Sequence, residues 1–138
     1  MKMRRIIYIC ILLFIVSCSK HKYYLSPFIQ GNIYDAKSKK PIDSVKLSIN
    51  LLEKSTLKVV SQRETLSSKD GFFSLNSDHI LYTGDGREES SLFDGRYTSF
   101  LILEKRGCKK DTIQIEKHWK RNDTIVKLDS IFLKSLEK

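Results

Sequence analysis

The stretch Val45-Lys46-Leu47-Ser48-Ile49-Asn50-Leu51 alternates apolar and polar side chains along its whole length. Successive side chains of a β-strand point to opposite faces, so this period of two is typical of a strand with one buried face. The same alternation recurs at residues 113–116 and 126–133. Residues 97–103 are apolar nearly throughout, which predicts a central strand covered on both faces.

Three more strands are predicted at residues 28–34, 57–65 and 72–76. Short turn sequences, such as Asp70-Gly71 and Arg106-Gly107, separate the predicted strands. No stretch repeats apolar residues with the i, i+3, i+4, i+7 spacing of an amphipathic helix. The sequence therefore predicts an all-β fold, a seven-stranded antiparallel β-sandwich over residues 27–138.

Two segments carry a resemblance to a known family. The first is Gly31-Asn32-Ile33-Tyr34-Asp35, followed by Lys40-Pro41-Ile42 and Val45, and the second is Ser68-Lys69-Asp70-Gly71-Phe72-Phe73-Ser74-Leu75. They resemble the opening strands and the Asp-Gly hairpin of carboxypeptidase regulatory-like domains. In such a hairpin the glycine takes a positive φ, and Phe73 and Leu75 then share one face. The resemblance implies a transthyretin-like sandwich that serves as an accessory module and has no catalytic residues of its own.

The start of the chain has the pattern of an export signal. Lys2, Arg4 and Arg5 precede an uncharged run of 11 residues, 6–16, which is shorter than the roughly 20 residues of a membrane-spanning helix. The run ends in Ile15-Val16-Ser17-Cys18, which resembles the lipobox of bacterial lipoproteins. We therefore expect a signal peptide over residues 1–17 and lipidation of Cys18. Alternatives are a secreted protein, which would favour an alanine-rich cleavage site, and a buried core helix.

Residues 18–26 are polar and basic and are expected to be a short tether between the lipid and the domain. Surface-exported lipoproteins of Bacteroidetes-type bacteria carry acidic residues after the lipidated cysteine, whereas this chain has Ser19, Lys20, His21 and Lys22. The expected location is the bacterial cell envelope, on the periplasmic face of the outer membrane.

The basic charge of the chain is partly a property of its signal. The chain has 25 basic and 16 acidic residues, and removal of Lys2, Arg4 and Arg5 leaves 22 basic residues and lowers the formal net charge from +9 to +6. Dispersed charges of this kind argue against nucleic-acid binding and are compatible with anionic lipid head groups or acidic glycans. Ten of the remaining 22 basic residues are spread over three separate predicted loops: Lys37, Lys39, Lys40, Lys105, Arg106, Lys109, Lys110, Lys117, Lys120 and Arg121.

The three cysteines predict a domain without an internal disulfide. Cys10 leaves with the signal and Cys18 is used by the lipid, so Cys108 has no partner. We expect Cys108 to be a half-buried thiol at a strand end rather than a nucleophile, because catalysis would need a base beside it.

The sequence offers no catalytic or metal-binding motif, so we expect no enzyme activity, no metal and no cofactor. His21, His79 and His118 are far apart and none belongs to a ligand-spaced motif. A cation could bind oxygens of Asp85, Glu88 and Glu89, but their spacing does not match an EF-hand.

The candidate binding residues are aromatic. Trp119, beside His118 in the loop before the last strand, either stacks on a ligand or covers one end of the core. Tyr82 and Phe93 lie in an insertion at residues 77–95, which is expected to fold back on the sandwich. The leading prediction is a membrane-anchored envelope lipoprotein that interacts with an envelope protein or serves a structural role. The alternative is a glycan-binding lipoprotein with an exposed aromatic platform.

Overall fold

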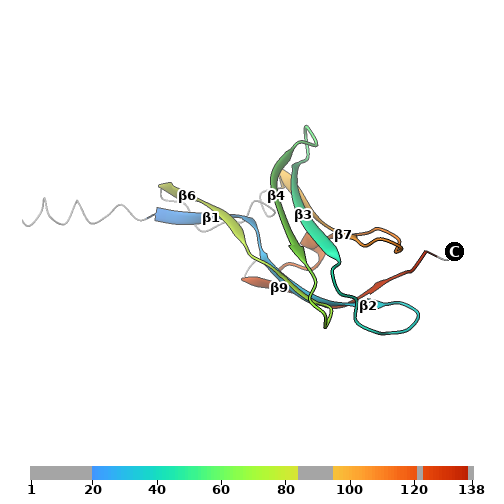
Figure 1. Ribbon diagram of the computed structural model, residues 1–138. Coiled ribbons are helices and arrows are strands. Elements are labelled where there is room, and N and C mark those ends of the chain that lie inside the picture. The colour runs from blue at the N-terminus through green and yellow to red at the C-terminus, as the bar shows by residue number, and fades with distance from the viewer. Residues whose placement is uncertain (1–19, 84–94, 121–122, 137–138) are drawn as a thin grey trace, which may run out of the picture.

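A computed structural model describes residues 20–83, 95–120 and 123–136 of the chain (Figure 1). Within these ranges no helix is long and apolar enough to cross a membrane. The elements in chain order are β1 Lys20–Ser26, β2 Phe28–Asp35, β3 Lys46–Glu53, β4 Val59–Leu66, β5 Phe72–Leu75, β6 Asp78–Thr83, β7 Tyr97–Glu104, β8 Asp111–Gln114, the 3-10 helix η1 Ile115–Lys117 and β9 Ile125–Leu133.

Two sheets form the body of the molecule, one with the strand order β5-β2-β9 and one with the order β4-β3-β7-β8. Figure 1 shows β3, β4 and β7 as one layer over the layer that holds β2 and β9. Alternate side chains of each strand point between the sheets, so an apolar core fills the interior. The prediction of an all-β sandwich is confirmed. The core includes Ile29, Ile33, Val45, Leu47, Ile49, Leu51, Phe73, Leu101, Leu103, Ile115, Val126 and Leu133.

The Asp70-Gly71 turn between β4 and β5 has the predicted conformation, but it connects strands of two different sheets and not the two strands of a hairpin. Gly71 has a φ of +74°, a conformation that costs glycine little and other residues much more. A Cβ at this position would lie 2.4 Å from the carbonyl oxygen of Ile33. After the turn, Phe72 points outward and Phe73 is buried in the core.

The strand arrangement differs from the predicted one in number and direction. The described residues contain nine strands rather than seven, since β1 and β6 add to the seven predicted segments. The last strand, β9, runs parallel to β2 rather than antiparallel. The chain crosses from β8 to the other sheet through η1 and re-enters at the end where β2 begins. Alternation along a single strand is the same for both directions of pairing, so the sequence pattern does not distinguish them.

Strands β1 and β6 form a two-stranded antiparallel ribbon that extends away from the sandwich (Figure 1). Most of the segment predicted as a tether is therefore a strand, and the first part of the insertion pairs with it instead of folding back on the sandwich. Asp78 fixes the base of this ribbon. Its backbone amide donates to Ser26 Oγ at 3.2 Å, and its carboxylate accepts hydrogen bonds from Ser61 at 2.5 Å and Arg63 at 2.6 Å.

Candidate functional site

Trp119, the foremost aromatic candidate, belongs to the core. Its side chain is only 7 % exposed, and its Nε1 donates a hydrogen bond to the carbonyl oxygen of Asp123 at 2.7 Å. Stacking on a sugar requires an open aromatic face. The indole therefore belongs to the sandwich core, which agrees with the alternative that Trp119 covers one end of it.

Of the other predicted binding residues, the structure describes the backbone of Tyr82 and the position of His118. Tyr82 lies in the ribbon, where its backbone is opposite His21. His118 is exposed and lies just after η1, on the sandwich. Phe93 and the lipidation candidate Cys18 lie outside the described residues.

His118 lies instead at a groove between the free edges of β8 and β9. The groove has a volume of about 410 Å³ and brings together residues from both sheets. Its walls are mixed in character, with apolar, acidic and basic side chains: Asp111, Ile113, His118, Lys127, Leu128, Asp129, Ser130, Ile131 and Phe132.

The two strands that border the groove differ in how open their edges are. On β8, the backbone amide of Thr112 already donates to Asp111 Oδ1 at 2.9 Å, which covers part of this short edge. On β9, eight of the nine residues Ile125–Leu133 pair with β2 on one side, and no described strand pairs with the other side. An open edge presents backbone donors and acceptors that can pair with another extended chain. The edge of β9 can therefore offer hydrogen bonds to the backbone of another extended chain.

The groove is closed at one end, where the two sheets meet. The amide of Lys109 donates to the carbonyl oxygen of Lys134 at 2.8 Å, and Leu136 donates to Gly107 at 2.8 Å. Ser135 Oγ donates to Asp35 Oδ1 at 3.0 Å, which adds the turn after β2 to the same place. Three segments that are distant in the sequence thus lie together.

We name this region the basic end and define it as residues 35–43, 104–111 and 133–136. It unites two of the three basic loops that the sequence presents separately, and it carries eight Lys and Arg side chains against four Asp and Glu side chains. The third basic loop, which includes Lys117 and Lys120, lies at the opposite end of β9. A cavity of about 190 Å³ at the basic end adjoins the groove through Asp111 and Phe132 and is also lined by Lys109, Lys110, Leu133 and Lys134.

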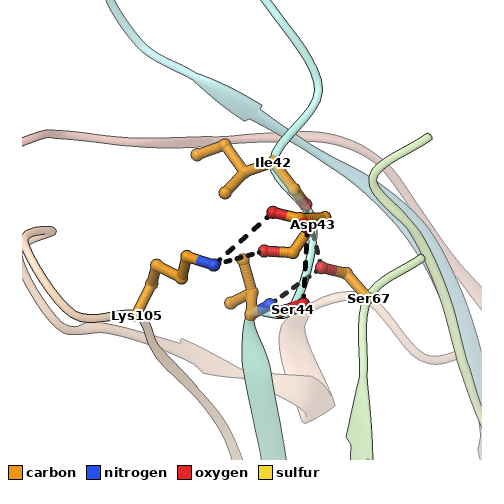
Figure 2. A network of polar contacts seen from close by, with 6 residues as sticks. Ile42, Asp43, Ser44, Ser67 and Lys105 are labelled. Carbon is orange, nitrogen blue, oxygen red and sulfur yellow. Dashed lines mark hydrogen bonds and ion pairs between the residues drawn. The ribbon is translucent and has the colours of Figure 1, made fainter. Parts of the chain in front are cut away.

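Some cations of the basic end have structural partners. Figure 2 shows Lys105, whose Nζ donates to the carbonyl oxygen of Asp43 at 2.8 Å and lies 3.5 Å from its carboxylate. Ser67 connects the same loop to β4, since its Oγ donates to Ile42 O at 2.8 Å and accepts from Val45 N at 3.0 Å. Lys110 pairs with Glu104 at 2.5 Å, and this ion pair lowers the pKa of Glu104.

Phe132, which the sequence analysis did not single out, lines both the groove and the cavity at the basic end. It is 45 % exposed, the Lys39 ammonium lies 4.4 Å from its ring centre, and its ring lies 5.8 Å from that of Tyr34. A cation over an aromatic face is an attractive contact. The alternation of β9 could have marked Phe132 as an outward-facing residue, but its neighbours come from other parts of the chain.

The structure describes the surroundings of two candidate reactive groups, Cys108 and Ser99. Cys108 is unpaired and half-buried. Glu116 Oε1 accepts a hydrogen bond from the amide of Ser99 at 3.0 Å, but Ser99 is fully buried and its hydroxyl is closed to a substrate. The described part of the chain has no group of three or more His, Cys, Asp and Glu side chains that could hold a metal ion. Asp85, Glu88 and Glu89 lie outside it.

No family model matches the chain, and no curated protein matches it in sequence. Several solved structures are similar in fold. The chain is similar to a 3-chlorocatechol 1,2-dioxygenase from Rhodococcus opacus, with a TM-score of 0.48 and 10% identity over 88% of this chain and 62% of that one. It is also similar to the major plantain pollen allergen, with a TM-score of 0.40 and 11% identity over 83% of this chain and 94% of the allergen. The third is a pilus backbone protein of group B streptococcus, with a TM-score of 0.41 and 14% identity over 80% and 41% of the two chains. These distant likenesses concern the fold alone, and the dioxygenase does not show whether this chain is an enzyme.

Proposed function

We propose that this protein is a lipid-anchored protein of the bacterial cell envelope that acts as a non-catalytic protein-interaction module. The observation that carries the proposal is the open outer edge of β9 beside the groove. An extended segment of a partner can add to such an edge through main-chain hydrogen bonds, while pockets beside it receive alternate side chains. The chemistry of the groove requires no reactive residue, which is why the module is proposed to be non-catalytic.

In this proposal the lipid is attached to Cys18. The support is the order of basic residues, an apolar run and Ser17-Cys18 within residues 1–18. Strand β1 begins at Lys20 and has seven residues, so the ribbon spans roughly 23 Å at about 3.3 Å per residue. The ribbon enters the sandwich where β2 begins, whereas the basic end lies where β2 ends. The groove and the basic end are thereby held away from the lipid.

The anchor is tested by Cys18→Ala in the native host. We expect the variant to accumulate as an unprocessed precursor or to leave the detergent phase, because no acyl chain is attached. Cys108→Ala is the matched control and should behave like the wild type. Equal partitioning of Cys18→Ala and the wild type into the detergent phase would contradict the lipid anchor.

The interaction role is tested with a photo-crosslinking amino acid at Ser130, in the groove, and at Ser74, on the opposite edge strand β5. Both serines are exposed. We expect a discrete crosslinked protein from position 130 and none from position 74. Crosslinks of equal yield at both positions, or none at position 130, would argue against the groove as an interaction site.

The periplasmic face is the proposed location, because Ser19–Lys22 contains no acidic residue. Protease added to intact cells should leave the protein whole, and protease added after disruption of the outer membrane should degrade it. Degradation in intact cells would place the domain on the cell surface.

A further inference from the structure

We propose that the groove binds an extended acidic peptide segment of a partner protein. The segment adds as a strand to the outer edge of β9 and places carboxylates at the basic end. This proposal rests on the proposed function above, which requires only that an extended chain enters the groove, and it adds the charge and the position of that chain.

The edge of β9 favours a peptide over other anionic ligands. In a strand, the N–H and C=O groups of alternate residues point to the outer edge, and a second strand satisfies both. A polysaccharide has no matching row of alternating donors and acceptors. Because Asp111 covers the amide of Thr112 on β8, β9 is the strand that is left to receive the partner.

A bulge divides the edge of β9 into two parts. Leu128 is opposite Gly31 and Ser130 is opposite Asn32, so Asp129 is an extra residue between two regular stretches. A bulge interrupts regular pairing at the point where it occurs. The regular stretch after the bulge, Ser130–Leu133, leads directly into Lys134, and a strand paired with it ends at the basic end.

The charges at the basic end select for carboxylates. Asp43 is engaged by Lys105 and Glu104 by Lys110. Lys109 and Lys134 have no ion-pair partner among the described residues, yet their backbones are hydrogen-bonded to each other at the closed end of the groove. Both lysines line the cavity at the basic end, and acidic side chains of a bound segment would supply the opposite charge that these lysines lack among the described residues.

The test measures binding of three short peptides to the full-length protein in a neutral detergent. One peptide alternates valine with glutamate, one alternates valine with glutamine, and one alternates valine with lysine. We expect the glutamate peptide to bind most tightly and its affinity to fall as salt concentration rises, because salt screens exposed charges. Polygalacturonate, an acidic polysaccharide, is the fourth probe and should bind more weakly than the glutamate peptide.

Two pairs of variants locate the binding. Lys109→Gln/Lys134→Gln removes two charges at the basic end, and Lys117→Gln/Lys120→Gln removes two charges at the other end of β9. We expect the first pair of substitutions to lower the affinity for the glutamate peptide by roughly threefold to tenfold. The second pair should leave this affinity unchanged. Ser130→Trp fills the groove and should abolish binding of the glutamate peptide, while Ser74→Trp on β5 should not. Unchanged thermal melting of each variant shows that the fold is intact.

The outcomes separate this proposal from the one on which it rests. Equal affinity for the glutamate and glutamine peptides, with both lost in Ser130→Trp, would overturn the acidic preference and leave the groove as a peptide site. Tighter binding of polygalacturonate than of any peptide would overturn the peptide itself. No peptide binding at millimolar concentration would overturn strand addition to β9.

Discussion

Arg63 on β4 donates a hydrogen bond to Asp78 at the base of the β1–β6 ribbon, with 2.6 Å between Nη2 and Oδ1. The residues are 15 positions apart, and their ion pair connects the four-stranded sheet to the ribbon that leads to the N-terminus. Partial burial raises the pKa of Asp78, but the hydrogen bonds from Arg63 and Ser61 outweigh it and lower the pKa overall. Asp78 is thus a charged structural residue of the folded chain.

The first prediction concerns this connection. Asp78→Ala leaves Arg63 and Ser61 without their carboxylate partner, and we expect it to destabilise the protein by about 1–2 kcal/mol, since both charged side chains are partly exposed. Urea unfolding measures the change, and hydrogen exchange should show faster opening of β1 and β6. Asp129→Ala, at the exposed bulge, is the control with the same loss of charge. Equal stability of the two variants would contradict a structural role for Asp78.

The second prediction is a dependence of stability on pH. The carboxylate of Asp35 accepts hydrogen bonds from the amide of Ser38 at 2.6 Å and from Ser135 Oγ at 3.0 Å. The backbone bond from Ser38 is the largest cause of a pKa lowered from 3.8 to about 2. Because the folded pKa lies below the unfolded one, the carboxylate stabilises the fold above pH 3.8, and this contribution is lost as the pH falls towards 2. NMR titration of the Asp35 carboxyl measures the pKa. In Asp35→Asn, the free energy of unfolding should fall less steeply than in the wild type as the pH is lowered from 3.8 to about 2.

The third prediction compares two glycines that both have positive φ. Gly71 has a φ of +74° and its added Cβ would meet Ile33 O at 2.4 Å, whereas Gly107 has a φ of +81° and no described atom within 4 Å of such a Cβ. Gly107→Ala should therefore lower the free energy of unfolding by about 1 kcal/mol, through backbone strain alone. Gly71→Ala adds a steric clash and should cost about 3 kcal/mol. Equal losses of stability in thermal unfolding would show that the turn before β5 can accommodate a Cβ at Gly71 without a clash.

The fourth prediction compares neighbouring phenylalanines of β5. Phe73 is 1 % exposed and Phe72 is 44 % exposed. Phe73→Ala should destabilise the sandwich by about 3–5 kcal/mol because it opens a cavity in the core. Phe72→Ala should cost about 1 kcal/mol or less, because its side chain already contacts water. Denaturant midpoints that move by the same amount would contradict the inward and outward assignment of these two side chains.

Much of the fold could be predicted from the sequence because it depends on neighbours along the chain. The alternation from Val45 to Leu51 predicted β3 and its buried face, and the Asp70-Gly71 turn predicted the inward position of Phe73. Strand periodicity and turn conformation are local properties, so a single sequence carries them. The end of the predicted strand at residues 113–116 was less accurate, since Ile115 begins a 3-10 helix and enters the core.

The candidate site was less predictable, because its residues come together only through pairing of distant strands. The indole of Trp119 lies in the core, β9 runs parallel to β2, and Lys109 lies beside Lys134. Each of these features depends on where the chain crosses from one sheet to the other. Such a crossing produces no periodic pattern in the sequence. Local alternation and turns thus determined that this chain forms a β-sandwich with a buried apolar face. The tertiary structure alone decided which strand edge stays open and which lysines gather at its end, because cross-sheet pairing sets these neighbours.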